Sequence, residues 1–165
     1  MGQNLTTFFQ SESGIRVQDF MDLKKLGIRS GSQCWVMFVD FLVLMDGGNV
    51  LDAASLAFKA ALYDLRLPQP LHSIVSLNKV PLYVTVSKVG DSFIFDASDQ
   101  EETCAFASLS LAMQKDGVCC GVIHTGCGSI AVPTYKAMIA SSVKIAAELH
   151  LALESAIDKQ KILKS

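Results

Sequence analysis

The chain is 165 residues long, half of its residues are hydrophobic, 18% are charged, and its formal net charge is −2. A chain of this length builds one domain with a substantial core, and its slightly acidic balance excludes a protein whose whole surface attracts nucleic acid. Asp40 interrupts the longest apolar run, so neither a membrane-spanning helix nor a membrane partner is expected. The first residues lack a secretory signal pattern, and the five cysteines are accordingly expected to be reduced thiols inside a cell.

Residues 34–62 form the stretch around which the rest of the chain is organised. Residues 34–45 are almost continuously apolar, which predicts a strand buried on both faces. The turn Asp46-Gly47-Gly48-Asn49 follows, and Asn49 is expected to cap a helix over residues 50–62. The predicted apolar stripe of that helix consists of Leu51, Ala54, Phe58, Ala61 and Leu62.

The segments on either side of this stretch are less regular. Residues 1–14 show no hydrophobic periodicity and are expected to be poorly ordered, whereas residues 17–26 predict a short amphipathic helix that ends at Gly27. The link after the central helix is irregular, with one short strand expected over residues 74–77.

The middle of the chain predicts an antiparallel sheet. From Pro81 onward the hydrophobic period is two, and the pairs Gly90-Asp91 and Asp116-Gly117 are typical of tight turns between strands. The expected strands cover residues 82–87, 92–95, 105–113 and 118–124.

A long amphipathic helix is predicted at the end of the chain. Pro133 suits its first position, and the helical pattern continues to about residue 159, after which three lysines make residues 159–165 a basic tail. Its stripe consists of Tyr135, Met138, Ile139, Val143, Ala146, Leu149, Leu153 and Ile157. Together these elements predict an α+β fold, with a largely antiparallel sheet and helices packed on one of its faces.

Two loop motifs have both a functional and a structural interpretation. The turn Asp46-Gly47-Gly48-Asn49 opens a helix, where free amides attract anions, but two glycines without a neighbouring cation are also typical of a plain strand-to-helix turn. The acidic run Asp96, Asp99, Glu101 and Glu102 offers carboxylates for a metal ion or an acid–base pair, yet acidic loops are commonly only solvated.

The cysteines and histidines carry weaker signals. Cys119 and Cys120 are adjacent, so a strand directs them to opposite faces, and no CxxC spacing indicates a zinc site. His124 and Cys127 could act as base and nucleophile, but no third group orients them, and a histidine at a strand end is the favoured interpretation. His72 and His150 stand alone, and neither is assigned a catalytic role.

In combination the motifs are specific. Their order resembles that of the RNase PH-like subunits of the RNA exosome, over about residues 15–157 and in the C-terminal half of the family's chain. The motifs that carry the resemblance are Cys34-Trp35, Val39-Asp40, Asp46-Gly47-Gly48-Asn49, Leu51-Asp52-Ala53-Ala54, Ala60-Ala61-Leu62, Leu67-Pro68, Val80-Pro81, Phe95-Asp96-Ala97, Glu101-Glu102, Lys115-Asp116-Gly117 and Gly126 to Ser129. The resemblance implies a partial RNase PH fold, similar to domain 2 of ribosomal protein S5, over residues 15–158. It also implies a fragment or short isoform, with residues 1–10 coming from an alternative start or a gene-model artefact.

The resemblance also implies that the family's active site has degenerated here. Active members carry Gly-Gly-Thr-Arg, in which the arginine grips the attacking phosphate, whereas Gly47 and Gly48 are followed by Asn49-Val50-Leu51. Of the family's acidic positions the chain keeps Asp96, Glu101 and Glu102 but has serines, Ser98 and Ser108, at two others. Without the phosphate clamp the phosphorolytic transition state is not stabilised, so no catalytic residue, cofactor or metal is expected.

Three functions follow from these expectations. The first is a non-catalytic subunit of the exosome ring, which supports RNA processing and decay in nucleus, nucleolus and cytoplasm together with other RNase PH-like subunits and RNA. The second is a phosphate-dependent 3′-to-5′ exoribonuclease, active alone or with a partner subunit, which requires a basic cleft. The third, without the resemblance, is a generic α+β interaction module.

Overall fold

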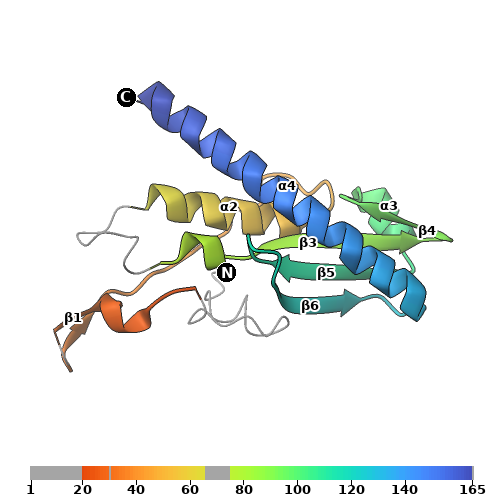
Figure 1. The fold of residues 1–165 in the computed structure, drawn as a ribbon, viewed down its shortest axis with the longest axis horizontal. Helices are drawn as coiled ribbons and strands as arrows, with labels where there is room; N and C mark the ends of the chain where they lie inside the picture. The colour runs from red at the N-terminus through yellow and green to blue at the C-terminus, as the bar shows by residue number, and fades with distance from the viewer. Residues whose placement is uncertain (1–19, 30, 66–74, 165) are drawn as a thin grey trace.

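The computed structural model describes residues 20–29, 31–65 and 75–164. Its centre is a four-stranded antiparallel sheet with the strand order β4-β3-β5-β6, and two helices, α2 and α4, pack against it (Figure 1). The strands are β3 (Leu82–Val89), β4 (Ser92–Phe95), β5 (Ala107–Met113) and β6 (Cys119–Thr125), and the helices are α2 (Val50–Asp64), α3 (Asp99–Cys104) and α4 (Val132–Lys164). The predicted α+β fold and the four strands are confirmed.

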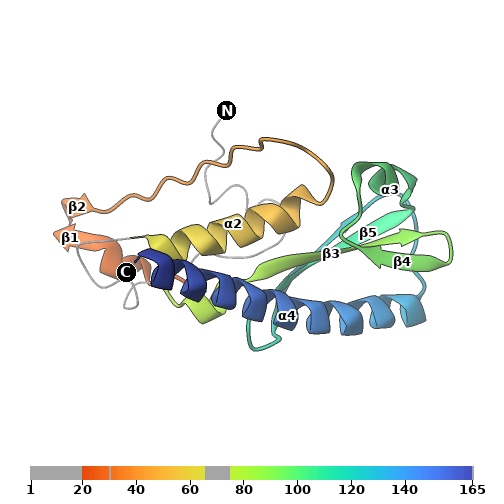
Figure 2. The same cartoon turned by 90° about the horizontal axis from the view of Figure 1, so that it is seen from above.

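The two long helices cover opposite faces of the sheet, which corrects the expectation that they share one face. The side chains of Tyr83 and Thr85 of β3 point toward α2, because Tyr83 clusters with Phe58 and the Thr85 hydroxyl donates a hydrogen bond to Asp52. Val84 and Val86 alternate with them and therefore point the other way, where they cluster with α4. Seen from above, α2 and α4 accordingly lie on either side of β3 (Figure 2).

Helix α2 begins where the sequence predicts, but its buried face is rotated from the predicted apolar stripe. Phe58 and Leu62 are buried as expected, whereas Ala61 is exposed. The polar residues Asp52, Ser55 and Lys59 are buried instead. They are accommodated because each finds hydrogen-bond partners, mainly on β3 or just before it.

Helix α4 is longer than predicted and continues to Lys164, so most of the predicted basic tail is helical. Met138 and Ala146 lie in the core on one side of the sheet, with Ser142 and His150 also buried on this helix. The C-terminal end of α4 extends beyond the sheet (Figure 1). None of the helices in the described part of the chain is long and apolar enough to cross a membrane.

The predicted buried strand over residues 34–45 is wrong. Only its first residue belongs to a strand, β2 (Gln33–Cys34), which pairs with β1 (Gly27–Arg29) in a separate two-stranded sheet. Residues 35–45 run past α2 without joining the four-stranded sheet (Figure 2). Met37 and Val39 pack on the core, but Phe38 is 78% exposed and Leu44 is 89% exposed. A strand buried on both faces needs cover on both sides, and the described residues supply it on only one.

The remaining predictions fall partly outside the described residues. Of the helix expected over residues 17–26, the structure shows a short 3-10 helix, Leu23–Leu26. Near the predicted short strand, Val75 forms an isolated bridge with Met21, and Leu77–Lys79 is a 3-10 helix. Residues 1–14 and the Leu67-Pro68 motif lie outside the described residues.

Candidate functional site

The double-glycine turn contacts the acidic loop after β4, and this contact explains why the second of its two residues is a glycine. Gly48 has a φ of 98°, and a Cβ atom there would lie 2.5 Å from the carbonyl oxygen of Ala97. Only glycine fits such a close approach of two backbones. Gly47, by contrast, has open space around the position of a Cβ atom.

Two residues in a left-handed backbone conformation join the loops. Asn49 has a φ of 52° and Asp96 a φ of 54°, a region that asparagine and aspartate enter more easily than other side chains. Asn49 Nδ2 donates a hydrogen bond to Asp96 Oδ1 at 3.0 Å, and its backbone amide donates to Glu102 Oε1 at 2.8 Å. The predicted role of Asn49 is therefore wrong in detail: it occupies the N-cap position of α2, but its side chain bonds Asp96 instead of the helix amides.

Glu101 does not belong to this junction. Its carboxylate accepts hydrogen bonds from the backbone amide and the hydroxyl of Ser98, both at 2.8 Å, and forms a capping box at the start of α3. These bonds from Ser98 lower the pKa of Glu101. Of the proposed counterparts of the family's active site, the structure brings together Gly48, Asn49, Asp96 and Glu102. Gly47 joins through its carbonyl, which accepts from the amide of Asp99 at 3.2 Å.

Asp52 is a buried residue beside the pocket for which no functional role was predicted from the sequence. Its carboxylate accepts hydrogen bonds from the amide and the hydroxyl of Thr85, both at 2.7 Å. The Thr85 hydroxyl also lies 2.8 Å from that of Ser110. Burial raises the pKa of Asp52, and the two bonds from Thr85 oppose that shift. The available signal was an aspartate in the first turn of a helix, where the dipole favours negative charge.

A pocket of about 430 Å³ lies between the double-glycine turn, α3 and the polar rows of the sheet. Its lining includes hydroxyl groups of β3, β5 and β6 and three carboxylates. The lining residues are Asp46, Asn49, Val50, Leu51, Thr85, Asp99, Glu102, Ala105, Ala107, Ser108, Ser110, Thr125 and Gly126. Three of these lining residues carry carboxylates and none is lysine, arginine or histidine, so the side chains of the pocket offer phosphate no opposite charge.

The other candidate groups form no catalytic set. His124 and Cys127 are both exposed, at and just beyond the end of β6. No group of three or more histidine, cysteine or acidic side chains in the described ranges could hold a metal ion. His72 lies outside the described residues, whereas His150 is buried at the opposite end of α2 from the pocket, near Lys59.

The comparisons with known proteins define the class. Residues 79–145 match the family model described as "3' exoribonuclease family, domain 2", which is the C-terminal domain of RNase PH. The structure is similar to that of a chain in the archaeal exosome core, with a TM-score of 0.74 and 26% sequence identity. The match covers 84% of this chain and 59% of that chain. The chain belongs to the RNase PH-like proteins, as the order of its motifs predicts.

Within this class the chain is similar to proteins named Rrp42, ribosomal-RNA-processing protein 42, as the order of its motifs also indicates. It is 35% identical over 124 residues to the exosome complex component Rrp42 of Methanocella arvoryzae, covering 72% of this chain and 48% of that protein. It is 30% identical to the putative exosome complex exonuclease RRP42 of Dictyostelium discoideum, over 68% of this chain and 40% of that protein. A second structure, the Archaeoglobus fulgidus exosome with RNA bound to its active site, gives a TM-score of 0.71 with 27% identity, covering 82% of this chain and 56% of that chain. The chain thus spans about half the length of the relatives it matches.

Proposed function

We propose that this chain serves as a non-catalytic subunit in the RNase PH-like ring of an exosome, where it supports 3′-to-5′ RNA processing and degradation. Its partners are then other RNase PH-like subunits and, through the assembled ring, RNA. The similarity to exosome complex components named Rrp42 and to two archaeal exosome structures supports this assignment. The processed RNAs include ribosomal precursors and messenger RNA, in the nucleus, nucleolus and cytoplasm.

One observation carries the non-catalytic part of the proposal. The pocket at the family's active-site position has three carboxylates on its wall, from Asp46, Asp99 and Glu102, and no cationic side chain among its lining residues. Phosphorolysis needs an inorganic phosphate held beside an RNA phosphate, and the negative charge of both must be offset. In this pocket each added phosphate instead meets further negative charge. Asn49, which follows the two glycines, is already bonded to Asp96.

The direct test is incubation of the purified chain with single-stranded RNA and inorganic phosphate. We expect no nucleoside diphosphates above the level of a chain-free control. Their release by the chain alone would overturn the proposal.

The pocket itself favours one alternative, because its volume and its row of hydroxyl groups leave room for a ligand. In this alternative a neighbouring subunit supplies the missing cation and completes a phosphate-dependent exoribonuclease site. An experiment on the assembled complex distinguishes the two candidate functions. Substituting Glu102→Gln and Asp99→Asn together leaves phosphorolysis by the complex unchanged if this pocket is non-catalytic, and abolishes one active site if it is shared.

The proposal on partners is tested separately. Tagged chain should co-purify with other RNase PH-like subunits, and a well-folded sample that never does so would contradict the assignment to the ring. In that case a generic interaction module becomes the better interpretation.

A further inference from the structure

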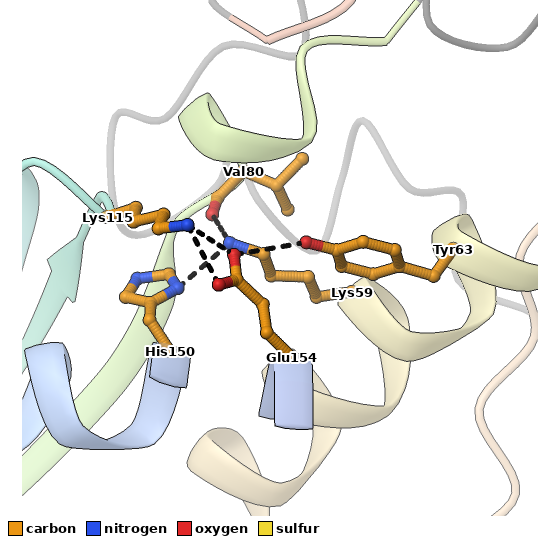
Figure 3. Close-up of polar contacts among 6 residues, drawn as sticks. All are labelled: Lys59, Tyr63, Val80, Lys115, His150 and Glu154. Carbon is orange, nitrogen blue, oxygen red and sulfur yellow. Dashed lines mark hydrogen bonds and ion pairs between the residues drawn. The ribbon is translucent and has the colours of Figure 1, made fainter. Parts of the chain in front are cut away.

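A second polar cluster lies where α2 and α4 meet beyond one end of the sheet, away from the pocket (Figure 3). Lys59 of α2 and His150 of α4 are its centre, and each side chain is only 1% exposed. Lys59 Nζ donates hydrogen bonds to the carbonyl of Val80 and to Nδ1 of His150, both at 2.9 Å. His150 Nε2 lies 3.1 Å from the carbonyl of Met113.

These contacts define the tautomer of His150. Nε2 faces a carbonyl, which only accepts, so it carries the proton and donates to Met113. Nδ1 faces an ammonium group, which only donates, so it must be the unprotonated nitrogen and accept from Lys59. The contact between the two helices therefore requires a neutral imidazole.

A proton added to His150 has no acceptor in this geometry. It would place an imidazolium 2.9 Å from the ammonium group of Lys59, with both groups buried. Burial lowers the pKa of His150, and its bond to Met113 opposes that shift only in part. The imidazole thus gains a proton more readily when the contact is open than when it is closed.

Other titratable groups from α2, α4 and the turn after β5 surround His150. Lys115, from the turn after β5, bonds Glu154 of α4 at 2.7 and 2.8 Å, and this bond lowers the pKa of Glu154. Tyr63 of α2 donates a hydrogen bond to Glu154 at 3.4 Å, and burial raises its pKa. Burial lowers the pKa of Lys59 to about 8, so it stays mainly protonated below pH 7.5. His150 is the group of this cluster whose ordinary pKa, about 6.5, lies between pH 7.5 and 5.5.

The C-terminal part of α4 depends on this cluster for its position. Met138, Ser142 and Ala146 are buried against the sheet, but no residue from 151 to 162 is fully buried. Beyond His150, the helix contacts α2 and the β5–β6 turn through Glu154, and Lys161 lies 5.9 Å from the centre of the Tyr63 ring. Leu153 and Ile157 are only partly buried.

We propose that Lys59 and His150 form a proton-sensitive latch, which holds the C-terminal part of α4 against α2 when the imidazole is neutral and releases it when the imidazole is protonated. The latch is a property of this fold and does not depend on the proposed function. Acidification then loosens residues 147–158 while the sheet and the first half of α4 stay packed.

Hydrogen exchange of the amides of residues 147–158 in the full chain tests the latch. If the open state protonates with an ordinary histidine pKa of about 6.5, opening should increase about tenfold from pH 7.5 to pH 5.5, after correction for the intrinsic effect of pH on exchange. The amides of β3 and β5 serve as internal references and should change by less than about twofold.

Two matched variants test whether His150 causes the pH effect on hydrogen exchange. His150→Gln retains an oxygen that can accept from Lys59 and an amide that can donate to Met113, but it does not titrate, so the pH effect should disappear. His124→Gln replaces an exposed histidine of β6 and should leave the effect intact. An unchanged wild-type exchange rate, or the same pH effect in His150→Gln, would overturn the proposal.

A measurement on the native chain covers the case in which His150→Gln does not fold. Nuclear magnetic resonance should give His150 a titration midpoint below the ordinary histidine value of about 6.5, and Lys59→Met should move the His150 midpoint upward by removing the facing charge. A His150 midpoint at or above that ordinary value in the native chain would contradict the latch.

Discussion

Helix α2 contributes to two polar clusters that lie at its two ends and differ in what surrounds them. At its first turn Asp52 accepts hydrogen bonds from Thr85, which lines a pocket together with Ser110 and further carboxylates. Two turns later Lys59 is buried and donates hydrogen bonds to a carbonyl and an imidazole. The first cluster retains the space of a binding site without the charge that phosphate needs, whereas the second holds two helices together.

The comparison shows why similar residue types have different consequences. A buried polar group contributes to stability when its partners are fixed, and it costs free energy when one partner is removed. The pocket cluster therefore combines structural groups, such as Asp52, with groups that face solvent, such as Glu102. The latch cluster is structural throughout, and its sensitivity to pH follows from its burial.

The largest expected effect concerns the turn that forms the pocket edge. Gly48→Ala should lower the free energy of unfolding by about 3 kcal/mol, because the new Cβ atom would meet the Ala97 carbonyl in a backbone conformation with positive φ. Gly47→Ala is the matched control and should change it by less than about 0.5 kcal/mol, since nothing lies within 4 Å. Equal effects in urea denaturation would show that the turn does not hold the two loops together.

A somewhat smaller effect is expected at the buried end of the same cluster. Asp52→Ala leaves the Thr85 amide without its 2.7 Å acceptor and should cost about 2 kcal/mol of unfolding free energy. Asp52→Asn keeps one oxygen acceptor in nearly the same shape, and we expect a loss of about 1 kcal/mol. Thermal denaturation of both variants checks this order; a larger loss in Asp52→Asn would mean that charge matters more than hydrogen bonding.

The latch cluster predicts a pH dependence in the alkaline range. Lys59 has a pKa of about 8 in the folded chain and 10.5 as its unperturbed value. The unfolded chain therefore binds more protons, so stability is lowest below pH 8 and rises toward pH 10.5. From pH 7.5 to 9.5 the free energy of unfolding should gain about 2 kcal/mol from this group. Lys59→Met should remove the gain, and a wild-type chain that loses stability over this range would contradict it.

The sequence predicted the elements whose information is local. Alternation with period two and the turn pairs Gly90-Asp91 and Asp116-Gly117 determine β3 to β6, and the order of motifs identified the family. The capping box of Ser98 and Glu101 was readable in the same way, from a serine followed three residues later by glutamate. That signal would have separated Glu101 from the pocket.

The features that were missed depend on partners distant in the chain. Lys59 is buried because the carbonyl of Val80 and the imidazole of His150, 91 positions away, satisfy it. An apolar stripe on a helical projection shows no such partner, and so the buried face of α2 was predicted with the wrong rotation. The strand predicted here over residues 34–45 is wrong for the converse reason. The composition of residues 35–45 indicates burial, but the described chain covers them on one side only.

The smallest expected effect concerns the exposed edge of the latch cluster, which is the pair of Lys115 and Glu154. Lys115→Met removes the bonds of 2.7 and 2.8 Å to Glu154, but both partners are partly exposed, so we expect a loss of only about 1 kcal/mol of unfolding free energy. Lys144→Met, on the exposed side of α4, is the matched control and should have no measurable effect. Because water screens such a pair, the loss should shrink in 1 M salt, whereas the alkaline gain assigned to buried Lys59 should persist. If salt weakened both alike, Lys59 would have to be accessible to solvent, and the contrast between a closed centre and an open edge would fail.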